Sequence, residues 1–339
     1  MRLTLPPPSG RSNLPILPVF MPFAGCPHRC LFCAQTRQTG QPVGTVQEAL
    51  ARLDHQLHER ERAGNGPVEV AFYGGTFTCL PFNEQQDCLR AVDRWREKRM
   101  VLAVRCSTRP DAVQPDRLNA LRGLGLDLVE LGVQTFADET LHFANRGYTG
   151  EMAEAGCRIV RAAGLRLGIQ LMPGIPGGSP EQFLEDTRRA LALQPVCLRM
   201  YPCLVIEGTA LADVWRQGVY RPWTEDMTVS VLGRALALAW EAGVPVIRLS
   251  LAPEPSLESA VLAGPRHPAL GNKIQSEALW QRLSPRLSDG KYLLRLPRHC
   301  QGVFSGYRGI LLPRWRDAGV QRVQWHNEDV AEITLWEDE

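Results

Sequence analysis

The chain has 339 residues, 44% of them hydrophobic, and a formal net charge of only +2. These values are typical of a globular protein with room for one large and one smaller domain, and they give no charge-based signal for a polyanionic partner. No uncharged apolar run reaches the roughly 18 residues that a membrane-spanning helix needs. The proline-broken N-terminus lacks the apolar core of a secretion signal, so we expect residues 1–14 to form a loose arm and the chain to stay in the cytoplasm.

Strand-like and helix-like patterns alternate along the first 200 residues. The stretch 16–23 predicts a strand, and the helix after it begins with a capping box formed by Thr45 and Glu48. A further helix is predicted over 83–98, and another begins at Ser179, which is followed by proline at the first helical position. The remaining strands of this part are predicted over 68–73, 100–106, 127–134, 165–172 and 196–201.

Six strand–helix units in series predict a parallel sheet covered by helices. Right-handed crossovers in sequential order would curl this sheet, so we expect a partial (β/α)6 TIM-like barrel, an α/β fold, over residues 15–252. A doubly wound open sheet is the rival architecture, but its usual Gly-x-Gly-x-x-Gly turn after the first strand is replaced here by a cysteine loop.

The pattern changes after about residue 223. A long helix is predicted over 224–243 and another strand over 244–252. Residues 253–339 are expected to form a small C-terminal α+β extension packed on the barrel. Its strands are predicted over 291–297, 308–313 and 320–325.

Ten cysteines in a reducing compartment are expected to be metal ligands or small buried side chains rather than disulfides. Three of them, Cys26, Cys30 and Cys33, are crowded into the loop "GCPHRCLFCAQ" after the first strand. The other seven are scattered singly, and we expect each to be buried: Cys79, Cys88, Cys106, Cys157, Cys197, Cys203 and Cys300.

Each candidate barrel strand ends in an unusual sequence, at the edge where α/β barrels place their chemistry. The second strand runs into "YGGTFT", whose Gly74 and Gly75 permit close approach of a ligand to the backbone. The third and fourth end near Arg109 and at Gln134, and the fifth runs into "MPGIPGG" from Met172. Six such loops beside three thiols predict a single site.

Three chemistries could use the three-thiol loop. Structural zinc needs four ligands, and only His28 and Cys79 are nearby candidates to complete the set. Redox-active thiols are the second possibility. A 4Fe–4S cluster held by three thiolates is the third, and it leaves one iron open for a reactant. Phe32, directly before the last of the three cysteines, would shield such a cluster from solvent.

The C-x3-C-x-Φ-C loop resembles that of radical S-adenosylmethionine enzymes. The motifs "FYGGTFT", "STRPD", "VELGVQTF…L…NRGYT", "MPGIPGG" and "YPCLVIEGTAL…GVYRPWT" resemble the radical domain of the Elongator catalytic subunit and its bacterial relatives, in matching order over roughly residues 15–225. The resemblance implies a 4Fe–4S cluster, S-adenosylmethionine, and a reductase, flavodoxin or ferredoxin as electron donor. It also implies cleavage of S-adenosylmethionine to a 5′-deoxyadenosyl radical that abstracts a hydrogen atom from the substrate.

The resemblance also implies roles for individual residues. Three irons would be held by Cys26, Cys30 and Cys33. The methionyl amine would meet the backbone of the glycine turn, and the adenine would lie along the stretch that begins at Met172. The implied cofactor-binding residues are Gly74, Gly75, Thr76, Arg109, Gln134, Arg146 and Met172. For Arg146 a helix-terminal surface arginine is an equally open interpretation.

The chain departs from these relatives after residue 252. Fewer than about 90 residues follow, without a Gln-x-x-Gly-x-Gly/Ala pyrophosphate loop, so the use of acetyl-coenzyme A is in doubt. Three functions stay open. The protein is a radical enzyme that acts on tRNA or another RNA, a radical enzyme that acts on a small metabolite, or a non-catalytic nucleic-acid adaptor with zinc in the loop. The basic residues of the tail fit an RNA surface and a solvated surface equally well: Arg282, Arg286, Lys291, Arg295 and Arg298.

Overall fold

The computed structural model describes residues 2–4, 14–251, 254–287 and 290–335. Within them, seven parallel strands form one curved sheet in the sequential order β2-β3-β4-β5-β6-β7-β9. Their bounds are Ile16–Phe20 (β2), Val68–Tyr73 (β3), Val101–Thr108 (β4), Leu128–Gln134 (β5), Arg166–Leu171 (β6), Cys197–Met200 (β7) and Val246–Arg248 (β9). The predicted partial barrel is therefore confirmed, with β9 as a seventh strand.

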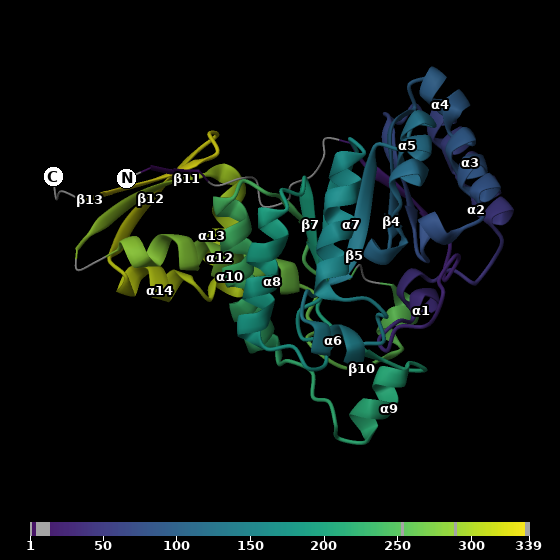
Figure 1. The fold of residues 1–339 in the computed structure, drawn as a ribbon. Coiled ribbons are helices and arrows are strands. Elements are labelled where there is room, and N and C mark those ends of the chain that lie inside the picture. The colour runs from purple at the N-terminus through teal and green to yellow at the C-terminus, as the bar shows by residue number, and fades with distance from the viewer. Residues whose placement is uncertain (1, 5–13, 252–253, 288–289, 336–339) are drawn as a thin grey trace.

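Helices cover the outer face of this sheet (Figure 1). The capping box at Thr45 is present, and the Ser179 side chain accepts a hydrogen bond from the Gln182 N–H, as predicted. The helices are α2 (Val46–Arg62), α3 (Phe82–Arg90), α4 (Asp93–Glu97), α5 (Pro115–Gly123), α7 (Gly150–Ala162), α8 (Pro180–Ala192) and α10 (Glu225–Glu241). The single helix predicted over 83–98 is wrong: the Val92 N–H bonds to the Leu89 carbonyl three residues back, and this tight turn separates α3 from α4.

Each strand of the barrel divides its side chains between two environments. On β3, Val70 and Phe72 are fully buried in the apolar core that the sheet shares with the helices. The alternate residues Glu69 and Tyr73 belong to the inner face, which is polar. A barrel of this kind usually fills its interior with branched apolar side chains. The inner face of this barrel instead carries buried charged and polar side chains.

Short elements at the carboxyl ends of the strands surround the opening. Two of these elements, α1 (Gln35–Thr39) and α11 (Pro255–Glu258), follow the two edge strands of the sheet, β2 and β9. They contact each other: the Ser256 hydroxyl on α11 donates to the Arg37 carbonyl on α1 at 2.8 Å. The elements are α1 (Gln35–Thr39), α6 (Asp138–Phe143), β8 (Val205–Ile206), α9 (Ala210–Arg216), α11 (Pro255–Glu258) and β10 (Val261–Ala263). Strands β8 and β10 pair antiparallel.

The C-terminal part forms a second sheet beside the barrel, in the order β1-β13-β11-β12 (Figure 1). Helix α12 packs against α10 and joins the two parts. The elements are β1 (Arg2–Thr4), α12 (Leu270–Leu283), β11 (Tyr292–Pro297), α13 (Gln301–Ser305), α14 (Leu312–Asp317), β12 (Val320–His326) and β13 (Val330–Leu335). The domain boundaries at residues 14 and 252 stay predictions.

Two predictions for the terminal regions are wrong. Residues 2–4 of the expected loose arm form β1, which pairs with β13 and places Arg2 Nε 2.8 Å from Glu332, whereas residues 1 and 5–13 of the arm lie outside the described residues. Three residues are too few for an alternation of side chains to be visible in the sequence. The stretch 308–313 is not a strand, because Gly309 has a positive φ and Pro313 sits in the first turn of α14. The strand predicted over 244–252 ends at Arg248, and residue 252 lies outside the described residues.

Candidate functional site

A cavity of about 350 Å³ opens at the carboxyl ends of the barrel strands. It extends from the cysteine loop into the polar interior of the barrel. All ten residues predicted for the site line it: Cys26, Cys30, Cys33, Gly74, Gly75, Thr76, Arg109, Gln134, Arg146 and Met172. The structure therefore brings together residues that are up to 146 positions apart in the chain.

The cysteine loop is braced by the glycine turn after β3. The Thr76 N–H donates to the Ala24 carbonyl at 2.7 Å, and the Thr76 hydroxyl lies 3.5 Å from Cys26 Sγ. Gly74 and Gly75 of this turn have positive φ angles of +80° and +66°. A Cβ on Gly75 would lie 2.0 Å from the Ala24 carbonyl oxygen, so only glycine permits this approach. This need is structural, and it operates whether or not the turn also meets a ligand.

Gln35 is a brace that the sequence did not reveal. Its side-chain oxygen accepts hydrogen bonds from the backbone N–H groups of Phe23 and Gly75, one on each side of the loop. It follows the third cysteine by two positions, and a glutamine there carries no signal without the tertiary structure. The amide thereby fixes the cysteine loop to the glycine turn.

The three thiols are close enough to influence one another. Burial, together with the neighbouring Cys30 and Cys26, raises the pKa of Cys33 to about 12. Among the described residues, no group of three Cys, His, Asp or Glu converges tightly enough to hold one metal ion. A 4Fe–4S cluster places each thiolate on a different iron, so the three thiols of the loop match three of its four ligand positions. Phe32 is buried beside Cys30 and Cys33.

Arg146 is a buried cation that points at the cysteine loop. Its guanidinium donates to Cys30 Sγ at 3.0 Å, to the Gly132 carbonyl at 2.6 Å and to the Tyr148 hydroxyl at 2.9 Å. The side chain is only 6% exposed, so the interpretation as a surface arginine is wrong. It forms no ion pair with a carboxylate among the described residues. A buried cation of this kind calls for an anionic partner, and the thiolates of the loop are the first one available.

Arg109 is in the opposite situation. Its guanidinium binds the Asp111 carboxylate through two hydrogen bonds of 2.9 and 2.8 Å, and it also contacts the Arg146 carbonyl oxygen. A third contact reaches His28 Nε2 at 3.2 Å. The charge of Arg109 is thus already neutralised, and its geometry serves to hold the cysteine loop against the segment around Arg146.

Gln134 and Met172 occupy neighbouring strand ends. Gln134 has a left-handed backbone, with φ of +70°, which is unusual for a residue other than glycine and costs on the order of 1 kcal/mol or more. Its carbonyl accepts from the Met172 N–H at 2.9 Å, and its side-chain oxygen accepts from the Gln170 amide at 3.2 Å. Both Gln134 and Met172 are buried and line the cavity. The strained backbone aims the Gln134 amide into that space.

An ion-pair network forms the interior wall of the cavity, and sequence reasoning missed it. The Glu130 carboxylate forms ion pairs with the guanidinium groups of Arg105 at 2.7 Å and Arg199 at 2.6 Å. It also accepts a hydrogen bond from the Tyr73 hydroxyl at 2.9 Å. Arg105 also pairs with Glu69. All four charged side chains are more than 90% buried. A single charged residue in each of four otherwise mostly apolar strands was the available signal.

The single cysteines behave mostly as expected. Six are buried, but Cys79 is exposed, because it ends the short turn that follows the glycine motif rather than a packed helix. No described helix has the length and apolarity needed to traverse a lipid bilayer.

Known proteins that are similar to this chain in sequence and in fold include enzymes that act on tRNA and radical SAM enzymes. A tRNA uridine(34) acetyltransferase from Methanocaldococcus jannaschii is 29% identical over 253 residues, which cover 63% of this chain and 47% of that protein. The chain thus spans about half the length of the curated relatives it matches. Among solved structures, an N-terminally truncated archaeal Elp3 from Methanocaldococcus infernus matches with a TM-score of 0.60 at 24% identity, covering 80% of this chain and 64% of that one.

A second solved structure, the radical SAM enzyme coproporphyrinogen III oxidase from Escherichia coli, matches with a TM-score of 0.51 at 22% identity, covering 70% of this chain and 54% of that one. These two structures support the fold. The family profile of the Radical SAM C-terminal domain matches residues 195–279, and that of the Radical SAM superfamily matches residues 20–190. Since the latter profile spans half of the chain, the protein belongs to the radical SAM superfamily, whose enzymes use a 4Fe–4S cluster and S-adenosylmethionine.

Proposed function

We propose that this radical SAM enzyme abstracts a hydrogen atom from a uridine of tRNA. The observation that carries the proposal is the joining of the three-thiol loop and the barrel interior in one cavity. When bound, the cluster and S-adenosylmethionine supply a 5′-deoxyadenosyl radical from one electron of a reductase, flavodoxin or ferredoxin. Support for tRNA comes from the relatives named tRNA uridine(34) acetyltransferase.

The residues of the chain divide the work of binding. Cys26, Cys30 and Cys33 would hold three irons of the cluster, leaving the fourth open to the cofactor. Arg146 is our candidate for the methionyl carboxylate, because it is the buried cation of the site that lacks a carboxylate partner, whereas Arg109 has one.

We assign proposed roles to the other predicted residues from their places at the cavity. Gly74, Gly75 and Thr76 line the cavity beside the cysteine loop and remain our candidates for the methionyl amine. Gln134 offers its amide to the ribose, and Met172 offers an apolar surface to the adenine. The network around Glu130 keeps the interior polar, which suits a substrate with hydrogen-bonding groups.

The first test concerns cofactor chemistry. Protein reconstituted without oxygen is expected to bind about four irons and, after reduction with dithionite, to release 5′-deoxyadenosine slowly without substrate. Cys30→Ala is expected to abolish iron binding and this release. Cys79→Ala is the matched control, since that thiol is exposed, and it is expected to keep both. Stoichiometric zinc without iron would overturn the assignment of the loop.

The second test concerns the substrate. With tRNA containing deuterated uridine, the enzyme is expected to produce 5′-deoxyadenosine that carries deuterium. Unlabelled 5′-deoxyadenosine, released at the same rate with and without tRNA, would contradict a tRNA substrate and move the proposal to a small metabolite. The radical assignment would be unaffected by that result.

A further inference from the structure

The charge of the chain is distributed unevenly. From the start of α12 to the end of β12, residues 270–326 contain ten Lys and Arg against three Asp and Glu, a formal charge of +7. Because the whole chain carries +2, the remaining residues carry −5. Residues 327–339 contain six Asp and Glu and no Lys or Arg, a formal charge of −6, so residues 1–269 carry only +1. The small overall charge therefore conceals a basic segment from α12 to β12 that is followed by an acidic one. A concentration of cations on one segment is an electrostatic feature that suits a nucleic-acid partner.

The cations of this part differ in how they are paired. Arg295 is neutralised by Glu332 at 2.9 Å and Arg314 by Glu277 at 3.2 Å, so neither is free for a phosphate. Five others are exposed and form no ion pair among the described residues: Arg286, Arg298, Arg308, Arg316 and Arg322. Exposed, unpaired guanidinium groups are the ones that can exchange their counterions for phosphates.

Two of these five arginines share a groove. Arg316 on α14 and Arg322 on β12 line a depression of about 250 Å³ between the helix and the strand. The exposed side chain of Leu312 lies at its edge, and the stacked rings of Phe304 and Trp315, 4.8 Å apart, form a rigid apolar floor. Arg308 is exposed on the turn just before α14. Apolar surface with two cations matches a nucleotide, which has an apolar base face and an anionic phosphate.

We infer that the α14–β12 groove, with Arg308, Arg316 and Arg322 around it, docks the phosphate backbone of an RNA substrate. This inference rests on the proposed function, because it takes RNA as the molecule that the barrel acts on. The groove lies in the C-terminal sheet and its helices, beside the barrel rather than at the cavity (Figure 1). Docking and radical chemistry are thus assigned to different parts of the chain.

The test is the salt dependence of tRNA binding. Binding of bulk tRNA to the reconstituted protein is measured by fluorescence anisotropy at several KCl concentrations. The triple variant R308Q/R316Q/R322Q is expected to lower the slope of log K against log salt by about 2 to 3, because each lost phosphate contact removes about 0.7 to 0.9.

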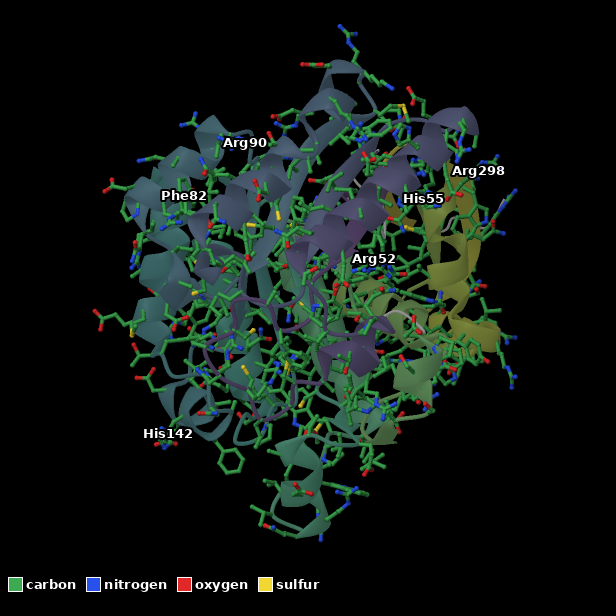
Figure 2. All side chains as sticks on the ribbon, turned by 90° about the vertical axis from the view of Figure 1, so that its right-hand side faces the viewer. Arg52, His55, Phe82, Arg90, His142 and Arg298 are labelled. Carbon is green, nitrogen blue, oxygen red and sulfur yellow. The ribbon has the colours of Figure 1, made fainter. Side chains whose placement is uncertain are left out.

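A second triple variant separates position from total charge. R52Q/R62Q/R90Q removes the same three charges from α2 and α3, where these arginines are exposed and form no ion pair among the described residues. Figure 2 shows Arg52 and Arg90 on the barrel helices, with Arg90 on the opposite side of the view from Arg298. The control is expected to change the slope by less than about 1, since its charges make no phosphate contact.

Three outcomes would overturn the inference. They are equal slopes for the two triple variants, no binding of tRNA by the unmodified protein at low salt, and equal displacement of tRNA by poly-glutamate, which would indicate an acidic protein partner. Release of 5′-deoxyadenosine without substrate is measured on the same samples and is expected to be unchanged in both variants. Its absence from the unmodified protein would count against the proposed function instead, so the two failures are distinguishable.

Discussion

Replacement of Arg146 by methionine removes the buried guanidinium of the site and keeps a side chain of similar length. The change deletes three hydrogen bonds, to Cys30 Sγ, to the Gly132 carbonyl and to the Tyr148 hydroxyl. Tyr148 stays anchored, because the carbonyl oxygens of Gly132 and Val133 lie 2.8 and 2.9 Å from its hydroxyl and either can accept its one proton. The perturbation is therefore confined to the cation and to what it binds.

The size of the effect follows from the burial of this cation. A hydrogen bond to a charged group contributes about 1.5 to 3 kcal/mol. If Arg146 holds the methionyl carboxylate, Arg146→Met is expected to weaken the binding of S-adenosylmethionine by about 10-fold to 150-fold. Arg146→Lys keeps the charge but loses the fork of donors, so it is expected to recover part of the loss.

The assay is calorimetric titration of S-adenosylmethionine into anaerobically reconstituted protein, with iron content measured on each sample. Arg109→Met is the matched control. That guanidinium is also buried and also lines the cavity, but Asp111 already neutralises it. We expect this variant to lower the melting temperature while it changes the affinity for the cofactor by less than about threefold.

Two results would refute the reasoning. The first is full iron content in Arg146→Met with an unchanged affinity for S-adenosylmethionine. The second is an equal loss of affinity in Arg109→Met and Arg146→Met. Either result would show that the absence of a carboxylate partner does not identify the residue that holds the cofactor.

Two further predictions concern the frame of the site. Gly75→Ala is expected to lower the iron content in a colorimetric measurement, because its Cβ would collide with the Ala24 carbonyl and displace the cysteine loop. Gly64→Ala is the control: Gly64 has nearly the same φ, a Cβ there would have no atom within 4 Å, and the variant is expected to keep full iron content. Glu130→Gln is expected to lower the free energy of unfolding by about 3 to 5 kcal/mol in denaturant titrations, because buried Arg199 loses its carboxylate partner and Arg105 keeps only Glu69. Glu61→Gln, which breaks the exposed pair with Lys98, is expected to lower it by less than about 1 kcal/mol. Equal effects of the two glutamate substitutions would contradict the interpretation of the network.

The order of the strands and the place of the three-thiol loop at their carboxyl ends could be predicted from the sequence because both rest on local signals. A strand of five to eight residues and a C-x3-C-x2-C spacing are visible in one short window. The failures occurred where the signal was too short or had two interpretations. Three residues of β1 cannot show an alternation, and the apolar run at 308–313 fits a strand as well as the start of α14.

The polar interior could not be predicted for a different reason. Glu69, Arg105 and Glu130 lie on three different strands, separated by at least 25 positions in the chain. Each residue alone is compatible with a solvent-exposed position on an edge strand. Only the register of the sheet, which pairs Ala71 with Arg105 and Arg105 with Leu128, turns them toward one another.

The two arginines of the site illustrate why a resemblance is not enough to assign roles. Arg109 lies within the motif "STRPD" and Arg146 within "NRGYT", for which the resemblance implies cofactor contacts. Both side chains are more than 90% buried beside the cysteine loop. Their difference is a carboxylate two residues after Arg109, which forms a bidentate ion pair and leaves that guanidinium without excess charge. Arg146 has a thiol, a hydroxyl and a carbonyl as partners, none of which is a carboxylate. A buried charge is costly without a counterion, so we propose that the cluster thiolates and the carboxylate of the cofactor supply the anion that Arg146 lacks.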